Sequence, residues 1–186
     1  TSYQNYSPNY HLSKVMGEGY EPGADWIEWG SGSAGWLYIY QMSGLEVYIH
    51  GYESEFSYRL NDIIRFDGSF SATRGENLTD NSSLYYMPPD RILLSTEINL
   101  PPFSINIMHK KVFSQNRIGL YESATPGYET YNLIGTYTIR NSWAVHKIIL
   151  QVDNVFDRKY YNHLSRIKSI MPEKGRNIGL QYRLNF

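Results

Sequence analysis

The last ten residues read Asn177-Ile178-Gly179-Leu180-Gln181-Tyr182-Arg183-Leu184-Asn185-Phe186, and they alternate between two kinds of side chain. The apolar and aromatic set is Ile178, Leu180, Tyr182, Leu184 and Phe186, and every position between them is polar or glycine. Successive side chains of a β-strand point to opposite faces. The pattern therefore predicts a strand with one dry face and one wet face, as in a transmembrane β-barrel whose outer face meets lipid.

The same alternation recurs upstream, and helical periodicity is hard to find. It predicts strands over residues 45–59, 64–73, 92–100, 131–140 and 147–153, another that begins at Phe103, and one more over 3–14. Together they make about eight strands of roughly ten residues, the length that crosses a bilayer when tilted. The chain is therefore predicted to be all-β and part of an antiparallel transmembrane barrel.

The connections between these strands alternate in length. Short turns are expected at Asn61-Asp62, Pro101-Pro102 and Asn141-Ser142, and long loops near 15–35, 75–90, 115–129 and 157–175. Short turns on one side and long loops on the other are typical of outer-membrane barrels, whose long loops face outward. A soluble β-sandwich is the alternative, but its loops have no reason to sort by length. The first long loop suggests no specific role.

Composition points the same way. The 186 residues include 18 Tyr, 7 Phe and 4 Trp, and Tyr and Trp favour the membrane–water interface. No run approaches the roughly 18 apolar residues of a membrane helix. The formal net charge of −1 offers no basic field, so no nucleic-acid partner is expected. The chain has no cysteine, which excludes disulfides and thiolate chemistry within it.

Catalytic and metal-binding patterns are hard to find. The five histidines are scattered without a close pair, so no metal or other cofactor is expected. Glu53 and Glu55 share a strand face, and we interpret them as part of a polar lumen wall balanced by Arg59, Arg65 and Arg183. An acid–base pair is the alternative, but the sequence has no Gly-x-Ser-x-Gly nucleophile turn. The chain is not expected to be an enzyme. An enzyme built on an outer-membrane barrel is the third of three hypotheses for its function.

From about Ser43 onward, six segments resemble, in order, the C-terminal part of the barrel of TonB-dependent outer-membrane receptors. They are residues 44–55, Met87-Pro88-Pro89-Asp90-Arg91, the strand start Pro126-Gly127-Tyr128, the Asn-hydrophobic-Phe-Asp-x-x-Tyr motif of residues 152–160, residues 162–177, and the closing Gly179 to Phe186. Each segment alone is a weak signal. Their order over roughly three quarters of the chain makes the resemblance specific.

The resemblance implies a barrel of about 22 strands around a plugged lumen. Residues 1–186 would be a C-terminal portion of it, with the plug domain and the N-terminal strands absent. A start at Thr1 without Met or signal peptide fits a mature or truncated chain. An open sheet of about eight strands would leave two unpaired edges in lipid. A self-contained eight-stranded outer-membrane barrel with a structural or adhesion role is the alternative.

The function implied by the resemblance is active uptake of a scarce ligand, most often a ferric siderophore or haem, across the bacterial outer membrane. Expected partners are outer-membrane lipid, the TonB complex acting through the plug, the barrel assembly machinery, and the iron chelate or a similar small ligand. Gly179, Tyr182, Leu184 and Phe186 resemble the terminal signal that this machinery recognises.

Residues expected to contact ligand lie in the predicted outer loops. Arginine suits anionic iron chelates and tyrosine can stack on them, and His163 lies in the segment that resembles the family's last loop. The expected set is Tyr85, Tyr86, Arg117, Tyr121, Tyr161, His163 and Arg166.

Overall fold

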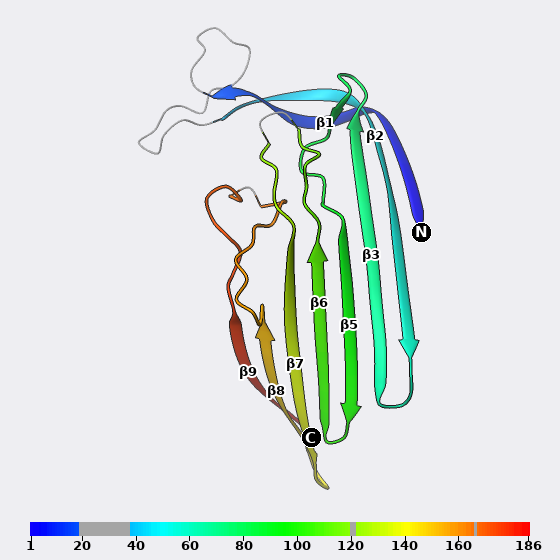
Figure 1. Cartoon of the computed structure of the whole chain (residues 1–186), viewed down its shortest axis with the longest axis vertical. Helices are drawn as coiled ribbons and strands as arrows, with labels where there is room; N and C mark the ends of the chain where they lie inside the picture. Colours follow the sequence, from blue (N-terminus) through cyan, green and yellow to red (C-terminus); the bar gives the residue numbers. More distant parts are fainter. Residues whose placement is uncertain (19–37, 120–121, 166) are drawn as a thin grey trace.

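A computed structural model describes residues 1–18, 38–119, 122–165 and 167–186, which form one antiparallel sheet (Figure 1). Within these ranges no helix has the length and hydropathy that a membrane crossing requires. The strands are β1 (Ser2–Glu18), β2 (Tyr38–Arg59), β3 (Ile64–Asn77), β4 (Ser82–Ser83), β5 (Arg91–Leu100), β6 (Phe103–Val112), β7 (Tyr128–Arg140), β8 (Val145–Asp153) and β9 (Asn177–Asn185). The all-β prediction is confirmed, and every strand expected from the alternation is present.

Each long strand pairs with the next long strand along the chain, in the order β1-β2-β3-β5-β6-β7-β8-β9, and the two-residue β4 pairs with β3. Strands β1 and β9 are therefore the two edges of the sheet. In the described ranges β9 pairs with β8 alone, so the sheet does not close on itself there.

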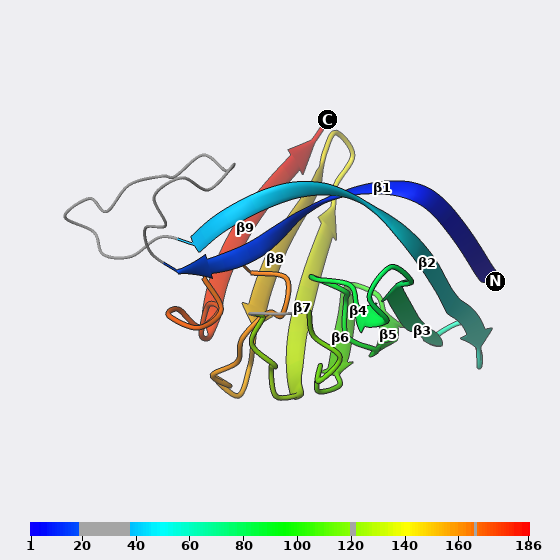
Figure 2. The same ribbon diagram turned by 90° about the horizontal axis from the view of Figure 1, so that it is seen from above.

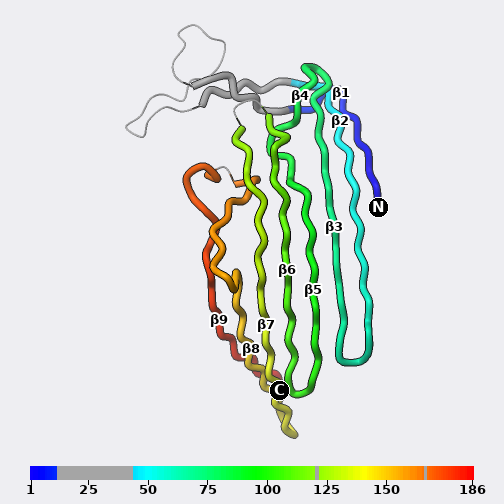
Figure 3. The backbone as a smooth tube through the Cα atoms, viewed as in Figure 1, coloured from blue at the N-terminus to red at the C-terminus, as the bar shows by residue number. Residues whose placement is uncertain are grey.

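Two of the three tight turns are closed by asparagine side chains. Oδ1 of Asn61 accepts hydrogen bonds from the backbone N–H groups of Ile63 and Ile64, at 2.9 and 2.8 Å. Oδ1 of Asn141 does the same for Trp143 and Ala144, at 3.1 and 2.7 Å. Such a bond to the backbone two or three residues on stabilises a turn. Figure 3 shows the short turns at one end of the sheet and the long loops at the other, so the predicted sorting of connections is confirmed.

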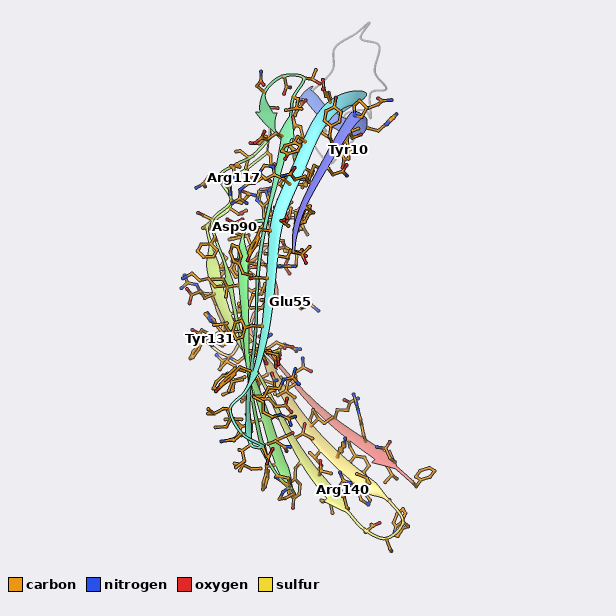
Figure 4. The ribbon with its side chains drawn as sticks, turned by 90° about the vertical axis from the view of Figure 1, so that its right-hand side faces the viewer. Tyr10, Glu55, Asp90, Arg117, Tyr131 and Arg140 are labelled. Atoms are coloured by element: carbon orange, nitrogen blue, oxygen red, sulfur yellow. The ribbon has the colours of Figure 1, made fainter. Side chains whose placement is uncertain are left out.

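The cross-strand register keeps the apolar residues on one face. Ile107 lies opposite Leu133, which in turn lies opposite Val152, and Val152 lies opposite Ile178. In Figure 4 this face, which includes Tyr131, is the convex side of the sheet, and Glu55 lies on the concave side. Many convex-face side chains are exposed, among them Phe56, Leu94, Ile105, Leu150 and Leu180. A wide exposed apolar surface is what a barrel presents to lipid.

The β1–β2 hairpin bends away from the plane of the sheet. Its register shifts between Ser7 and Tyr10, where Pro8 and Asn9 both lie opposite Glu46. Proline has no N–H to give to the ladder, so a β-bulge is a favourable position for it. Beyond this bulge the hairpin arches over the concave side of the sheet (Figures 1 and 2). Most of the long loop expected over 15–35 lies outside the described residues.

A small apolar core fixes the loop between β3 and β5 to the sheet. Val47 and Leu84 are each 1% exposed and lie together with Leu45. The close approach depends on Gly75, because a Cβ there would lie 2.5 Å from Sδ of Met87 and 2.8 Å from Cδ1 of Leu84. Leu84 and Met87 therefore lie over the inner side of β2 and β3.

Candidate functional site

Three long loops meet at the carboxylate of Glu122, at the end of the sheet opposite the tight turns. Oε1 of Glu122 lies 3.0 Å from Nε2 of His163 and 3.1 Å from Nζ of Lys168, both in the loop between β8 and β9. The N–H of Tyr86, in the β3–β5 loop, donates to both carboxylate oxygens at 3.2 and 3.4 Å. Oε2 also accepts a hydrogen bond from the N–H of Gly119 at 3.1 Å. Glu122 thus links residues of all three loops, and Tyr86, Glu122, His163 and Lys168 are called the Glu122 cluster below.

His163 is the most deeply buried member of the Glu122 cluster, with a fully buried side chain. Its Nδ1 lies 3.0 Å from Oγ1 of Thr125 and 3.3 Å from Nζ of Lys168. An ammonium group only donates, so Nδ1 is the acceptor and the proton is on Nε2, facing Glu122. The Nε2 contact does not have the geometry of a hydrogen bond. Burial and the charge of Lys168 lower the pKa of His163 below its ordinary value, against the opposite effect of Glu122.

Lys168 brings the positive charge that Glu122 requires. Its side chain is 7% exposed and that of Glu122 is 4% exposed, so each charge would be strongly destabilised without the other. Nζ of Lys168 also lies 5.8 Å from the ring centroid of Tyr86, a distance at which a cation is attracted to the ring. With His163 neutral, the Glu122 cluster carries one negative and one positive charge.

A second connection between loops runs through Gln115 and Thr125. The N–H of Gln115 donates to the carbonyl of Thr125 at 3.0 Å, and the N–H of Thr125 donates to the carbonyl of Gln115 at 3.2 Å. This pair of hydrogen bonds brings the two sides of the β6–β7 loop together in a narrow neck. Nε2 of Gln115 donates to the carbonyl of Met87 at 2.9 Å, which ties this neck to the β3–β5 loop. Gln115 is 2% exposed and Thr125 is 6% exposed. The loops therefore form one hydrogen-bonded layer.

The Asn-Val-Phe-Asp motif after β8 has a structural role in the last long loop. Nδ2 of Asn154 donates to the carbonyls of Arg158 and Lys174, at 2.9 and 3.4 Å, and its Oδ1 accepts from the N–H of Arg158 at 2.9 Å. Oδ1 of Asp157 accepts from the N–H of Arg176 at 2.7 Å. Asn154 and Asp157 adopt left-handed backbone angles, with φ of 50° and 52°, which Asn and Asp tolerate better than other residues with side chains. The motif thus holds the two ends of the loop together.

The predicted ligand-contacting residues do not share one surface. Tyr86 and His163 belong to the Glu122 cluster, where Tyr86 is 44% exposed and His163 is buried. Tyr85 lies against Gly119, and Tyr161 lies near Nζ of Lys159 at 5.9 Å from its ring centroid. Tyr121 and Arg166 lie outside the described residues.

Arg117 is in a different place from Tyr86 and His163. One of its guanidinium nitrogens lies 3.9 Å from Oδ2 of Asp90, and Asp90 forms a two-pronged ion pair with Arg74. In Figure 4 both Asp90 and Arg117 lie on the same convex side as Tyr131, away from Glu55. The structure therefore puts Arg117 on the outer side of the loop layer rather than over the concave face.

The residues that join the loops were not found by sequence reasoning. Glu122, Thr125 and Lys168 are isolated polar residues in loops, and no spacing rule connects them. The nearest signal was the prediction that His163 is important, because it lies in a segment with a family resemblance. That prediction concerned contact with ligand, and it did not indicate that the side chain is buried beside the carboxylate of Glu122.

The concave face of β3, β5 and β6 carries hydrogen-bonded polar side chains, in line with the predicted polar wall. Asn106 donates to Oγ of Ser95 at 3.0 Å, and Nε of Arg91 donates to Oγ of Ser71 at 2.9 Å. Arg65 forms its ion pair with Asp67 of its own strand, at 2.8 Å. The nearest counter-charge of Arg65 is therefore on its own strand, whereas the sequence suggested a balance with Glu53 and Glu55.

Comparison with known proteins bears on the fold. No protein-family profile matches the sequence. The copper transporter OprC superposes with a TM-score of 0.71 at 23% identity, over 79% of this chain and 24% of that one. A chain from the FpvAI–pyocin S2 complex superposes with a TM-score of 0.61 at 19% identity, over 77% of this chain and 20% of that one. This chain spans about a quarter or less of the length of those two. At these identities the likeness shows that the chain has the fold of part of a TonB-dependent receptor barrel.

Proposed function

We propose that this chain forms C-terminal barrel wall and outer loops of a TonB-dependent receptor, which imports a scarce ligand across the bacterial outer membrane. The observation that carries the proposal is the two-faced, open sheet, which superposes on the barrel of the copper transporter OprC over 79% of the chain. One of the two solved chains is named as a copper transporter, and the other comes from a complex of FpvAI with pyocin S2. This supports a transport role without catalysis.

The edges of the sheet support a larger barrel. Strands β1 and β9 lie at opposite edges of the described sheet, and exposed backbone edges are not tolerated in lipid. Further strands, carried outside residues 1–186, would pair with both edges and close the barrel. A self-contained barrel would need β1 to pair with β9, and no pairing between them is present in the described ranges. The plug and its contact with the TonB complex would likewise lie outside this chain.

The cargo that we propose is a ferric siderophore or haem. Exposed Tyr86 offers an aromatic ring at the loop layer, and buried His163 would act by holding that layer in shape. Arg117 is exposed as well, but on the convex side. The remaining members of the proposed ligand-contacting set are Tyr85, Tyr121, Tyr161 and Arg166.

Uptake by cells that produce the complete protein tests this function. Radiolabelled ferric siderophores, haem, cobalamin and copper would be supplied one at a time, with a strain that lacks TonB as the matched control. We expect one iron ligand to accumulate only when TonB is present. Equal accumulation in both strains for all of these ligands would contradict active receptor-type transport.

A further inference from the structure

On the convex face of β6 and β7, aromatic and aliphatic side chains occupy successive levels from the tight turns toward the loops. Next to the turns, Phe103 and Tyr137 lie with ring centroids 4.7 Å apart. Six residues further along each strand, His109 stacks on Tyr131 at 4.5 Å. The paired positions between these two aromatic levels hold Ile105, Gly135, Ile107 and Leu133. Six residues of strand span about 20 Å, close to the height of the apolar band of an outer-membrane barrel between its two aromatic girdles.

Charged side chains begin immediately above the upper aromatic level. Nζ of Lys111 lies 2.8 Å from Oε1 of Glu129, and these two residues are opposite each other on β6 and β7. Side chains at this height face the headgroups of the outer leaflet, not its acyl chains. Lys111 and Glu129 therefore lie where lipid headgroups meet the protein.

A pocket of about 490 Å³ opens at the same height, and it is lined by residues of β6 and β7, of both ends of the β6–β7 loop and of the last loop. Tyr131 and Phe156 contribute an aromatic wall, with ring centroids 5.3 Å apart and planes at 85°. Phe156 is 71% exposed, and the Asn154 and Asp157 turns direct it toward Tyr131. Lys111 and Arg158 bring positive charges to the same pocket. Because Tyr131 lies on the convex side (Figure 4), this pocket faces the membrane and not the lumen.

The charges favour an anionic occupant. Lys111 and Arg158 carry two positive charges against the single negative charge of Glu129, which leaves a net charge of +1. Glu129 holds Lys111 in position and also lies 3.3 Å from Nε2 of His109. The guanidinium of Arg158 forms no ion pair with any other described residue, so it is free to bind phosphate through two parallel hydrogen bonds.

We propose that this pocket binds the phosphorylated headgroup of a glycolipid of the outer leaflet, that is, of a lipopolysaccharide. Arg158 and Lys111 hold a phosphate, and the rings of Phe156 and Tyr131 contact the adjoining sugar and the first carbons of the acyl chains. The pocket faces the membrane, carries a net positive charge and has an aromatic wall. These properties suit an amphiphile in the membrane better than a soluble anion that enters through the lumen. The inference rests on the proposed function, because it needs the barrel to lie in the outer membrane.

The test compares glycolipid retained by the complete receptor after purification from the outer membrane in mild detergent. Lipid A phosphate per receptor would be measured for the unchanged protein, for Lys111→Gln/Arg158→Gln, and for the control Lys159→Gln/Lys174→Gln. The control removes two charges from the same loop outside the pocket. We expect the first pair to lower retention about tenfold, because two charge-assisted hydrogen bonds are lost, and the control to leave it unchanged. Phe156→Ala should lower retention as well, without any change in charge.

Cell fractionation and ligand uptake separate this inference from the proposed function. Lys111→Gln/Arg158→Gln is expected to reach the outer membrane, to show the heat-modifiable migration of a folded barrel, and to import ligand normally. Equal lipid retention by all charge variants in a correctly inserted receptor would overturn the lipid site alone. A receptor that is not recovered in the outer-membrane fraction would overturn the proposed function and this inference together.

Discussion

Oε1 of Glu122 lies 3.0 Å from Nε2 of His163, which joins a loop that follows β6 to a loop that follows β8. The same oxygen binds the ammonium of Lys168, and both carboxylate oxygens accept from the backbone of Tyr86. One buried carboxylate thus determines the relative position of three loops. Changes at this residue should alter the loop layer while the strands below it remain intact.

Glu122→Gln should open the loop layer locally. The substitution keeps the shape of the side chain but leaves the buried ammonium of Lys168 without its counter-charge, which costs about 3 kcal/mol. Hydrogen exchange of the Tyr86 and Gly119 amides in the complete protein is the measurement. We expect both amides to exchange faster, while those in the middle of β6 and β7 do not change. Glu53→Gln, an exposed carboxylate on the concave face, is the matched control, and equal protection in both variants would argue against the role of Glu122.

The loop layer should weaken in mild acid because of His163. Its pKa is lowered in the closed layer, so the opened layer takes up a proton more readily. The stabilisation is therefore fully present above the ordinary value of 6.5 and decreases as the pH falls below it. A nitroxide label at Ser123→Cys, in a chain without native cysteine, reports loop motion by its spectral width. We expect greater motion at pH 5.5 than at pH 7.5, and no such difference once His163→Gln is added.

Asn154 should be the most sensitive position of the last loop. Asn154→Ala removes its three hydrogen bonds and puts alanine at a φ of 50°, so we expect a loss of about 3 kcal/mol in the stability of the loop. Asn154→Gly removes the same bonds without the backbone penalty and should cost less. Protease cleavage between residues 157 and 175 of the folded protein measures the effect of both substitutions. A larger effect for glycine than for alanine would contradict the backbone contribution.

Phe186→Ala tests whether the terminal residue serves as an assembly signal together with Gly179, Tyr182 and Leu184. Phe186 is 94% exposed, so truncating its side chain removes almost no contact with other described residues. If the residue is a signal, the amount of heat-modifiable protein recovered in the outer-membrane fraction should fall several-fold. Leu180→Ala is the control, because Leu180 is 76% exposed on the same strand and lies outside the proposed signal. Equal insertion of both variants would contradict a role of Phe186 in the assembly signal, and Phe186 would then be an ordinary exposed side chain of the apolar face.

The strands could be predicted because their cause is local. Alternation places Ile178, Leu180 and Tyr182 on one face whatever lies elsewhere in the chain, and Asn61 and Asn141 close turns within three residues. The pairing of β2 with β3, of β5 with β6 and of β7 with β8 then follows from the short turns between them. The resemblance to TonB-dependent receptors is confirmed for the fold, at identities of 23% and 19%.

The loop layer could not be predicted in the same way because its contacts join distant residues. Nothing near Glu122 in sequence indicates a lysine 46 residues away or a tyrosine amide 36 residues away. Arg117 illustrates the same difficulty, since its charge suggested ligand contact but its position depends on Asp90 and Arg74. Alternation predicts on which face of the sheet the side chain of a strand residue lies. The direction in which the side chain of a loop residue points depends instead on its partners in other loops.

The tight-turn hairpins join residues that are close in sequence, whereas the loop contacts join residues that are far apart in sequence. This difference predicts an order of folding. The three hairpins with tight turns, β2–β3, β5–β6 and β7–β8, each close only a few residues, so little entropy is lost in forming them, and the hairpins can then pair with one another. The Glu122 cluster assembles only after the strands on both sides of each loop have brought three separate segments together. We expect an intermediate with a complete ladder of strands and unjoined loops, in which sheet amides are already protected and the amide of Tyr86 is not.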